Sequence, residues 1–345
     1  MELTGHMKNK AFQKTIVLVL FASIFIACDS NKKQKAIVEE KNNPEVLEKI
    51  FVPDFNADSA YTFVAKQVSF GPRVPNTKAH IACGNFLTKF FLSNSTWVTP
   101  QEFVSKSFDS KELRLKNIIA SYNPKATKRI ILASHWDTRP FADQDSKDTK
   151  SPSDGANDGA SGVGILMEIA RAINKAEKKP DVGIDFILFD GEDYGQPSFY
   201  EGPYQNDSWC LGSQHWSKNK HVANYTAYYG VLLDMVGAKN ATFAREGVSL
   251  ENAPSVVENV WQTGQRIGYG NYFINIQSPS ITDDHAYVNK IAMIPMIDII
   301  EFDTKGPNYF GAYWHTHNDN MNVIDKNTLK AVGQTLLEVV YREKL

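Results

Sequence analysis

The stretch Arg129-Ile-Ile-Leu-Ala-Ser-His-Trp-Asp137 is an apolar run that ends in a histidine and an aspartate. Two later runs have the same form, because Ile184–Asp190 precedes Glu192-Asp193 and Tyr228–Leu233 precedes Asp234. Short apolar runs of this kind are typical of buried strands. Open α/β sheets place ligand sites beyond the carboxyl ends of their strands. We therefore expect His, Asp and Glu side chains from three strands to meet at one edge of a sheet, as a ligand set suited to zinc.

A helix is predicted between the first two of these runs. In Gly159–Asn174, Ile165, Ile169 and Ile173 recur every four residues, with small and apolar residues beside them. That spacing is typical of the buried face of a helix. Strands that alternate with helices predict an α/β fold in three layers, with a mostly parallel central sheet and helices on both faces.

Further elements are expected on both sides of this core. Residues 57–68 and 76–93 have helical spacing, and the apolar face of Asp325–Arg342 predicts a terminal helix. Residues 114–121 and 129–135 are expected to be neighbouring strands joined by Asn123-Pro-Lys, and 292–300 is another apolar run. The long polar segments 141–156 and 194–209 adjoin the acidic clusters, so we expect them to form the walls of a binding site.

Composition limits the classes of function. The chain has 345 residues and a formal net charge of -2, without a dense run of Lys and Arg, so no nucleic-acid partner is expected. No internal repeat and no second linker follow residue 48, which favours one catalytic domain over residues 49–345.

The N-terminus has the form of a secretory signal. Three lysines precede the apolar run Thr15–Ala27, which is short for a membrane span and ends at Cys28. Ile26-Ala27-Cys28 resembles the lipobox of bacterial lipoproteins, in which the cysteine is lipidated, so residues 1–28 are interpreted as a lipoprotein signal peptide. An ordinary signal peptide or short anchor with an incidental cysteine is the alternative. The polar residues 29–48 are expected to be a flexible linker, and the domain is expected at the cell envelope, anchored by lipid on its periplasmic or surface face.

Only Cys83 and Cys210 remain in the predicted domain. Two cysteines do not make a disulfide framework, and the sequence leaves open whether they are bridged or are two buried thiols.

Each candidate site residue also has an ordinary explanation. Asp158 precedes a helix, where aspartate is a favoured N-cap, and Glu192-Asp193 follows a turn-like Asp-Gly. Adjacent carboxylates repel unless a cation or a proton holds them, so one of this pair is a candidate metal ligand and the other a candidate acid/base. Asp283-Asp284-His285 could be an exposed helix cap. His315 follows Trp314 and is a stronger ligand candidate than His317.

The order of these motifs resembles that of the zinc aminopeptidase-like enzymes. Within that group, it is most similar to the animal-type glutaminyl cyclases and their bacterial relatives. The similarity spans about residues 50–345. The strings that carry it are Phe189-Asp-Gly-Glu-Asp193, Leu232-Leu-Asp-Met-Val-Gly-Ala238, Asp283-Asp-His285 and Trp314-His-Thr316. Trp314 directly before the late histidine and the Asp-Asp-His cluster favour a cyclase over an aminopeptidase.

The resemblance implies a role for each matching residue. Asp158, Asp193 and His315 would be the ligands of one zinc ion, and Glu192 would be the acid/base. Asp234 and Asp283 would form a hydrogen-bonded carboxylate pair, and Trp314 would line the substrate pocket. The family often has Glu where this chain has Asp193, so the reach of that ligand differs here. Which of Tyr194, Tyr204 and Trp209 supplies a further pocket aromatic is left open.

The implied reaction is the zinc-dependent cyclisation of an N-terminal glutamine on peptides or proteins to pyroglutamate, with release of ammonia. The alternative enzyme is an aminopeptidase with two zinc ions, in which Asp158 bridges them and His135 and Asp234 hold the second. Under the cyclase interpretation, His135 and Asp137 support the site without binding the essential zinc. A non-catalytic peptide-binding lipoprotein is a third hypothesis, and the presence of Glu192 counts against it.

Overall fold

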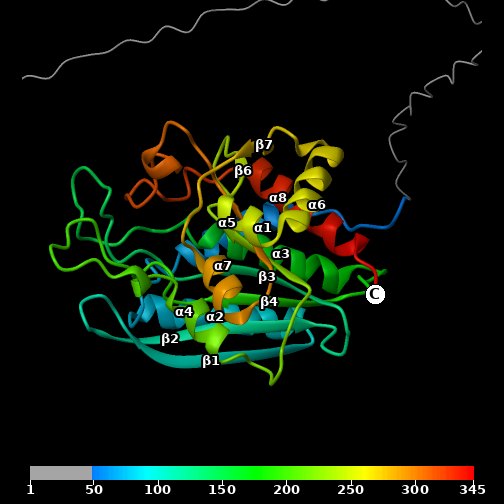
Figure 1. Ribbon diagram of the computed structural model, residues 1–345, viewed down its shortest axis with the longest axis horizontal. Coiled ribbons are helices and arrows are strands. Elements are labelled where there is room, and N and C mark those ends of the chain that lie inside the picture. Colours follow the sequence, from blue (N-terminus) through cyan, green and yellow to red (C-terminus); the bar gives the residue numbers. More distant parts are fainter. Residues whose placement is uncertain (1–48) are drawn as a thin grey trace, which may run out of the picture. The chain divides into compact units, whose positions relative to one another are not determined.

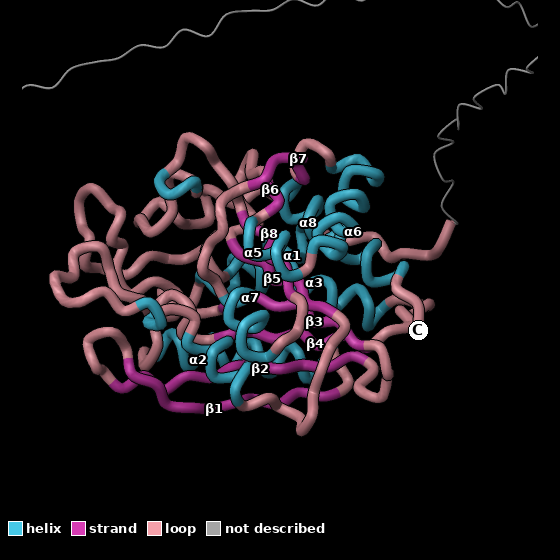
Figure 2. The backbone as a smooth tube through the Cα atoms, in the orientation of Figure 1, coloured by secondary structure: helices cyan, strands magenta, loops and turns pink. Residues whose placement is uncertain are grey.

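Six strands form the central sheet, in the order β1-β2-β4-β3-β5-β8, within residues 49–345, which are the part of the chain that this computed structural model describes. Strands β4, β3, β5 and β8 are parallel to one another, β2 pairs antiparallel with β4, and β1 pairs antiparallel with β2. Figure 2 shows β1 and β2 at one edge of the sheet. The predicted mostly parallel sheet is therefore confirmed. The strands are β1 Trp97–Lys106, β2 Glu112–Tyr122, β3 Arg129–His135, β4 Gly183–Phe189, β5 Tyr229–Asp234 and β8 Met296–Ile300.

One predicted pairing is wrong, because β2 and β3 are not neighbours and β4 lies between them. Asp185 of β4 gives the physical reason. Its buried carboxylate accepts a hydrogen bond from Ser121 of β2 and pairs with Arg129 of β3 at 2.6 Å. A buried carboxylate needs such partners, and here they stand on the two flanking strands.

Helices cover both faces of the sheet, as predicted (Figure 1). Successive strand residues point to opposite faces, so Ile130 and Leu132 pack into one core while Ile131 and Ala133 pack into the other. The first core is covered by α1 Ala57–Val68, α2 Lys78–Asn94, α3 Ala160–Lys175 and α8 Lys326–Arg342. The second is covered by α4 Leu211–Lys218 and by the π-helical turn η3 Val288–Ala292, which follows α7 Asp284–Tyr287.

The predicted helices are confirmed with small shifts of their ends. Residues 57–68 match α1, and the other three helices begin within two residues of the expected positions. Asn56, Thr77 and Asp325 each accept a backbone N–H in the first turn, which explains where α1, α2 and α8 begin. Strand β1 was not predicted, and it contains a proline, which weakens a strand signal.

The remaining elements surround this framework. They are the two-stranded sheet β6 Phe243–Arg245 and β7 Phe273–Gln277, the helices α5 Gly247–Asn252 and α6 Pro254–Gly264, and the short turns η1 Asn206–Ser208, η2 Gln265–Tyr269 and η4 Pro307–Tyr309.

Two sequence predictions concern the N-terminus and the cysteines. The signal peptide, Cys28 and the linker fall within residues 1–48, outside the described residues, so they stay predictions. Over residues 49–345, no helix is long and apolar enough to cross a membrane. Cys83 and Cys210 are both buried free thiols, which settles the question of a bridge between them.

Candidate active site

The carboxyl ends of β4, β3 and β5 lie side by side, as the sequence predicted. His135 is the last residue of β3 and Asp234 the last of β5, while Glu192 and Asp193 follow β4 after a short turn. The Trp136 N–H donates to the Phe189 carbonyl at 3.0 Å, which continues the pairing of β3 and β4 past the strands. The three polar clusters therefore meet at one edge of the sheet.

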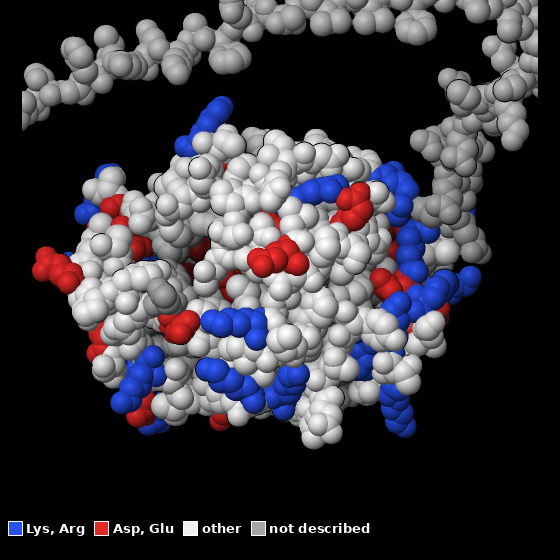
Figure 3. Space-filling model, in the orientation of Figure 1, with Lys and Arg blue, Asp and Glu red and all other residues white. Residues whose placement is uncertain are grey.

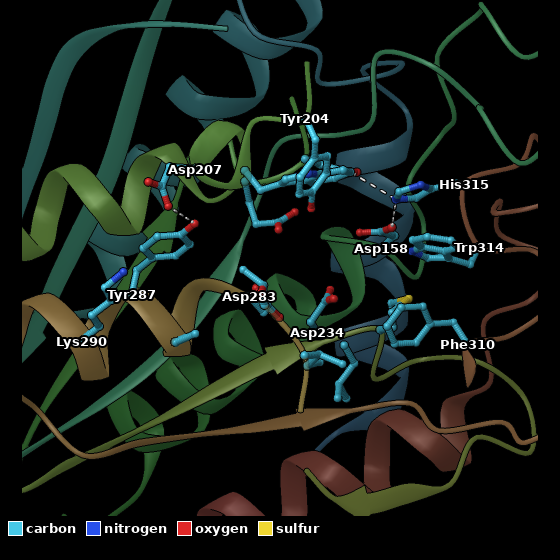
Figure 4. Close-up of a pocket in the computed structure, with 18 residues that line it drawn as sticks. Asp158, Tyr204, Asp207, Asp234, Asp283, Tyr287, Lys290, Phe310, Trp314 and His315 are labelled. Atoms are coloured by element: carbon cyan, nitrogen blue, oxygen red, sulfur yellow. Dashed lines mark hydrogen bonds and ion pairs between the residues drawn. The ribbon is translucent and has the colours of Figure 1, made fainter. Parts of the chain in front are cut away.

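Asp158, Asp193 and His315 form a buried cluster in which one ligand atom from each lies within 4.8 Å of the others. His315 Nε2 is 3.4 Å from Asp193 Oδ1 and 3.8 Å from Asp158 Oδ2 (Figure 4). Asp193 Oδ1 is buried and has no hydrogen-bond donor among the described residues. An unpartnered buried carboxylate oxygen is costly, so this arrangement indicates that a cation completes the cluster.

The backbone around Asp158 leaves its carboxylate free for that cluster. The N-cap of α3 is Gly159, without a side-chain cap, so Asp158 does not serve as the cap that its position suggested. Asp319 instead accepts the N–H groups of Asn157 and Asp158, at 2.7 and 3.1 Å. Gly159 has a φ of +93°, and a Cβ built there would lie 3.0 Å from a ring carbon of His135. Only glycine therefore fits between the two site residues.

His315 is held by an ion pair that the sequence analysis missed. Its Nδ1 lies 3.1 Å from Asp143 Oδ1, and Asp143 also pairs with Arg139 at 3.0 Å. Burial alone would raise the pKa of Asp143, but its bonds to His315 and Arg139 hold that pKa below its usual range. Arg139 donates further to the carbonyls of Asp193 and Gly195, at 2.8 and 2.9 Å. The Arg139 guanidinium thus holds the Asp193 backbone directly and the His315 ring through Asp143.

The segment 141–156 therefore has a different role from the one predicted. It contributes no residue to the cavity lining, because it lies behind His315 and supplies Asp143. The segment 194–209 does form a wall, through Tyr204, Asp207 and Trp209. No feature of the sequence distinguished the wall segment from the supporting segment, since both are long and polar.

Replacing Asp143 by asparagine should weaken zinc binding by about 10- to 100-fold, the usual cost of losing an outer partner of a metal-binding histidine. The amide keeps the shape but removes the charge that fixes the Nδ1–H tautomer of His315. Competition with a chelator measures the change. Asp148→Asn is the matched control in the same segment, and equal zinc affinity in both variants would contradict this role.

A second buried cluster shares Asp158 with the first. His135 Nε2 is 3.1 Å from both Asp158 Oδ1 and Asp234 Oδ1. Asp137 Oδ1 is 3.6 Å from His135 Nδ1, and the Asp137 carboxylate also accepts the N–H groups of Glu192 and Asp193, at 3.1 and 3.2 Å. The Asp137 carboxylate therefore holds the Glu192-Asp193 turn through two hydrogen bonds, a role that was not predicted. Its support of the His135 ring stays a prediction.

Glu192 is half-buried in the same region, and its surroundings alter the pKa of its carboxylate. Burial raises the pKa of Glu192 well above its usual range, and the charges of Asp283 and Asp193 raise it further against the opposing effect of His135. Its Oε1 accepts a hydrogen bond from the Cys210 thiol at 3.3 Å, and its Oε2 lies 4.0 Å from His135 Nδ1. A half-buried glutamate whose pKa is raised by its surroundings is suited to general acid–base catalysis.

Asp283 leads into a chain of buried acids that the sequence analysis did not identify. It is the N-cap of α7, only 4% exposed, so the exposed-cap explanation is wrong. Asp283, His285 and Asp298 form a buried group in which one polar side-chain atom from each lies within 4.8 Å of the others. His285 lies 3.8 Å from Asp298 and 3.1 Å from Glu246. Asp234 lies on the same cavity wall, and burial raises its pKa to about 7, with Asp283 adding to the effect. The direct hydrogen bond between Asp234 and Asp283 stays a prediction.

A cavity of about 710 Å³ opens onto these groups, and Figure 3 shows acidic side chains inside a hollow on this face. Its wall beside His315 is aromatic. The Trp314 ring stacks on His315 with centroids 3.7 Å apart, and Phe310 packs beside Trp314 (Figure 4). Trp209 and Tyr204 also line the cavity. Tyr194 does not line the cavity, because it is buried against Phe108, so Tyr204 and Trp209 are the two of the three candidate aromatics that do.

The first cluster fits a zinc ion by its chemistry. Two carboxylates and one imidazole are a usual zinc ligand set, and three protein ligands leave a position for a substrate atom. His315 presents Nε2 to the cluster while a carboxylate holds its other nitrogen, which is the usual arrangement of a zinc-binding histidine. The unpartnered Asp193 Oδ1 has the ligand chemistry that the ion needs.

The chain is similar to a known protein family and to curated relatives. Residues 117–340 match the model of peptidase family M28. The glutaminyl-peptide cyclotransferase of Gloydius blomhoffii is 27% identical over 246 residues, which are 64% of this chain. The match spans 63% of that relative's own length.

Two solved structures are more similar. A glutaminyl cyclase of Bacteroides thetaiotaomicron, bound to N-acetylhistamine, is 53% identical with a TM-score of 0.83. A Zn-dependent exopeptidase from Parabacteroides distasonis has the same identity and TM-score. Each match covers 85% of this chain and 100% of the solved chain.

Proposed function

This chain belongs to peptidase family M28, where its similar structures include bacterial glutaminyl cyclases, and from that premise we propose that it cyclises N-terminal glutamine on peptides to pyroglutamate, with release of ammonia. The observation that carries the proposal is the aromatic wall at the metal cluster. Trp314 stacks directly on His315, so the cavity beside the ligands is closed by apolar surface. Such a wall favours a glutamine folded back on itself and keeps water from the reacting atoms.

One zinc ion per chain is the proposed cofactor, held by Asp158, Asp193 and His315. When bound, it supplies a Lewis acid for the side-chain amide carbonyl of the substrate. The network of Arg139, Asp143 and Asp319 keeps those three side chains in place.

Glu192 is the proposed acid/base. Its carboxylate takes a proton from the α-amine as that nitrogen attacks the side-chain amide carbon and forms the ring C–N bond. Glu192 then gives the proton to the departing amide nitrogen as the old C–N bond breaks, so ammonia leaves and the peptide keeps its charge balance. The substrate supplies its own nucleophile, so no activated water is needed.

Asp234 and Asp283 are proposed to receive and orient the α-amine. Both carboxylates line the cavity beside Glu192, and Lys290 is the only lysine or arginine among the described residues of that lining. An amine brought among them gains favourable charge interactions in a site of low dielectric. The raised pKa of Asp234, about 7, allows it to share a proton with its neighbours.

A second candidate function rests on one specific observation. His135, Asp158 and Asp234 form a second possible ligand group, so the same site has the donors of a two-zinc aminopeptidase. In that case Glu192 would activate a water molecule, and the enzyme would remove the first residue of a peptide.

Two peptides that differ only in their first residue test the choice. With a glutamine start, we expect ammonia and a peptide that has lost one ammonia. With a leucine start, we expect no change. Free leucine from the second peptide, without ammonia from the first, would replace the cyclase with the aminopeptidase.

We also propose that the enzyme acts at the cell envelope, held by lipid on Cys28. The apolar run Thr15–Ala27 before Cys28 supports this. In the native host, Cys28→Ala should abolish acyl labelling and move the protein from the membrane to the soluble fraction. Since one acyl chain binds membranes only marginally, stable anchoring presumes several chains. Unchanged membrane association of the variant would contradict a lipid anchor.

A further inference from the structure

The cavity extends past the carboxylates to a polar rim on the side opposite His315. Figure 4 shows Lys290, Tyr287 and Asp207 together on that side, across the cavity from Trp314. Lys290 belongs to η3, while Asp207 comes from the wall segment before Trp209. Tyr287 donates its hydroxyl to Asp207 Oδ1 at 3.0 Å, so these two elements meet at the rim.

Lys290 is the only lysine or arginine among the described residues that line the cavity. Its side chain is exposed, and no carboxylate of the described residues lies within ion-pair distance of it. The other charged lining residues are acids: Asp158, Glu192, Asp193, Asp207, Asp234 and Asp283. The rim therefore carries one lysine without an ion pair among the described residues, beside a strongly acidic interior.

The backbone of Lys290 is fixed by the residue before it. Asn289 is buried, and its amide nitrogen donates to the carbonyls of His285 and Met296, at 2.9 and 2.8 Å. Its Oδ1 accepts the Met296 N–H at 2.9 Å. These bonds tie the π-helical turn to β8, so the base of the lysine side chain keeps one position on the rim. Such turns are frequent at functional sites.

A substrate must cross this rim. If the first residue occupies the zinc and Glu192 end, the rest of the peptide chain leaves through the cavity mouth, because cyclisation leaves that chain intact. About 710 Å³ is more than one glutamine fills, so the next residues still lie inside the cavity or at its edge. Their charges are then close to Lys290.

We propose that Lys290 makes this enzyme selective for peptides that carry a carboxylate shortly after the first residue. The carboxylate belongs either to an acidic side chain or to the free C-terminus of a short peptide, and both have the same chemistry. Asp207 keeps its negative charge at this rim, because a hydrogen bond from the Tyr287 hydroxyl does not neutralise a carboxylate, but Asp207 forms no ion pair with Lys290 among the described residues. This inference rests on the proposed cyclase function and names its substrate class.

Three tripeptides distinguish these sources and measure the effect. They are Gln-Glu-Ala amide, Gln-Gln-Ala amide and Gln-Gln-Ala with a free C-terminus. The measured quantity is kcat/KM for ammonia release, expressed as the ratio of each acidic peptide to the neutral amide. We expect at least one ratio above unity in the wild type, and the peptide that gives it identifies the source of the carboxylate.

Lys290→Met should lower that ratio by between about 1.5-fold and fivefold, the range expected for an exposed charge pair. Lys290→Glu should make the neutral amide the better substrate. Added salt should reduce the preference of the wild type, because it screens exposed charges. The matched control is Lys89→Met, since Lys89 is an exposed lysine on α2 and outside the cavity lining, and its ratio should equal that of the wild type.

The outcomes separate this inference from the proposed function. Ammonia release from the neutral amide supports the cyclase whatever the ratios are. If the ratios are the same in wild type, Lys290→Met and Lys290→Glu, the role of Lys290 is overturned while the cyclase stands. If no tripeptide releases ammonia, the result contradicts both the cyclase function and the role of Lys290.

Discussion

Replacing Glu192 by glutamine is expected to lower turnover by about 10²–10⁴-fold, which is the usual contribution of general acid–base catalysis. The amide keeps the shape of the side chain but cannot take the proton of the α-amine. KM should change far less than kcat, since the variant loses an interaction made in the transition state. Ammonia release from a Gln-initiated peptide measures both constants.

Two further measurements make this result interpretable. Zinc content and the unfolding temperature of Glu192→Gln should match those of the wild type, because Glu192 is not among the three proposed ligands. Glu251→Gln, an exposed position on α5, is the matched control and should keep full activity. Near wild-type turnover in Glu192→Gln would remove this residue from the mechanism, and Asp283 would be the next candidate.

Loss of a zinc ligand is the second change with a large expected effect. Asp193→Ala or His315→Ala should weaken zinc binding by more than about 100-fold, beyond what changes in outer partners cause. Activity should disappear with the metal in both variants. Metal analysis of the purified proteins and the ammonia assay give the two readouts.

His135→Ala and His317→Ala provide contrasting variants. Under the cyclase proposal, His135 supports the site, so its variant should keep close to one zinc per chain. His317 is partly exposed and pairs with Asp145 outside the cavity, so its variant should behave as the wild type. A fall from two zinc ions to one in His135→Ala would favour the aminopeptidase.

Much of the fold could be predicted because hydrophobic periodicity is a local signal. The strands that end at His135 and Asp234 and the helix after Gly159 are continuous apolar patterns, and the structure confirms them. The order of strands is not a local property. The position of β4 between β2 and β3 depends on where Asp185 finds its partners, Ser121 and Arg129, and these lie far from it in the sequence.

The candidate site also has residues that the sequence predicts and residues that it does not. The residues at strand ends could be predicted, since parallel strands bring their carboxyl ends to one edge. The supporting groups could not, because Arg139, Asp143 and Asp319 act on backbone atoms and on histidine nitrogens across long sequence separations. Asp298 is a similar case. It lies in an apolar, buried strand, where an ionisable residue is unusual. That position was the one feature of the sequence that could have identified it.

Zinc titration of the metal-free enzyme tests the central claim most directly, because it measures the reaction and the number of ions together. Zinc is added in steps up to two equivalents per chain, in the presence of one peptide that begins with glutamine and one that begins with leucine. The account predicts that ammonia release rises to a plateau at one equivalent and that no free leucine forms at any step. Free leucine that increases with the second equivalent, without ammonia at the first, would contradict it.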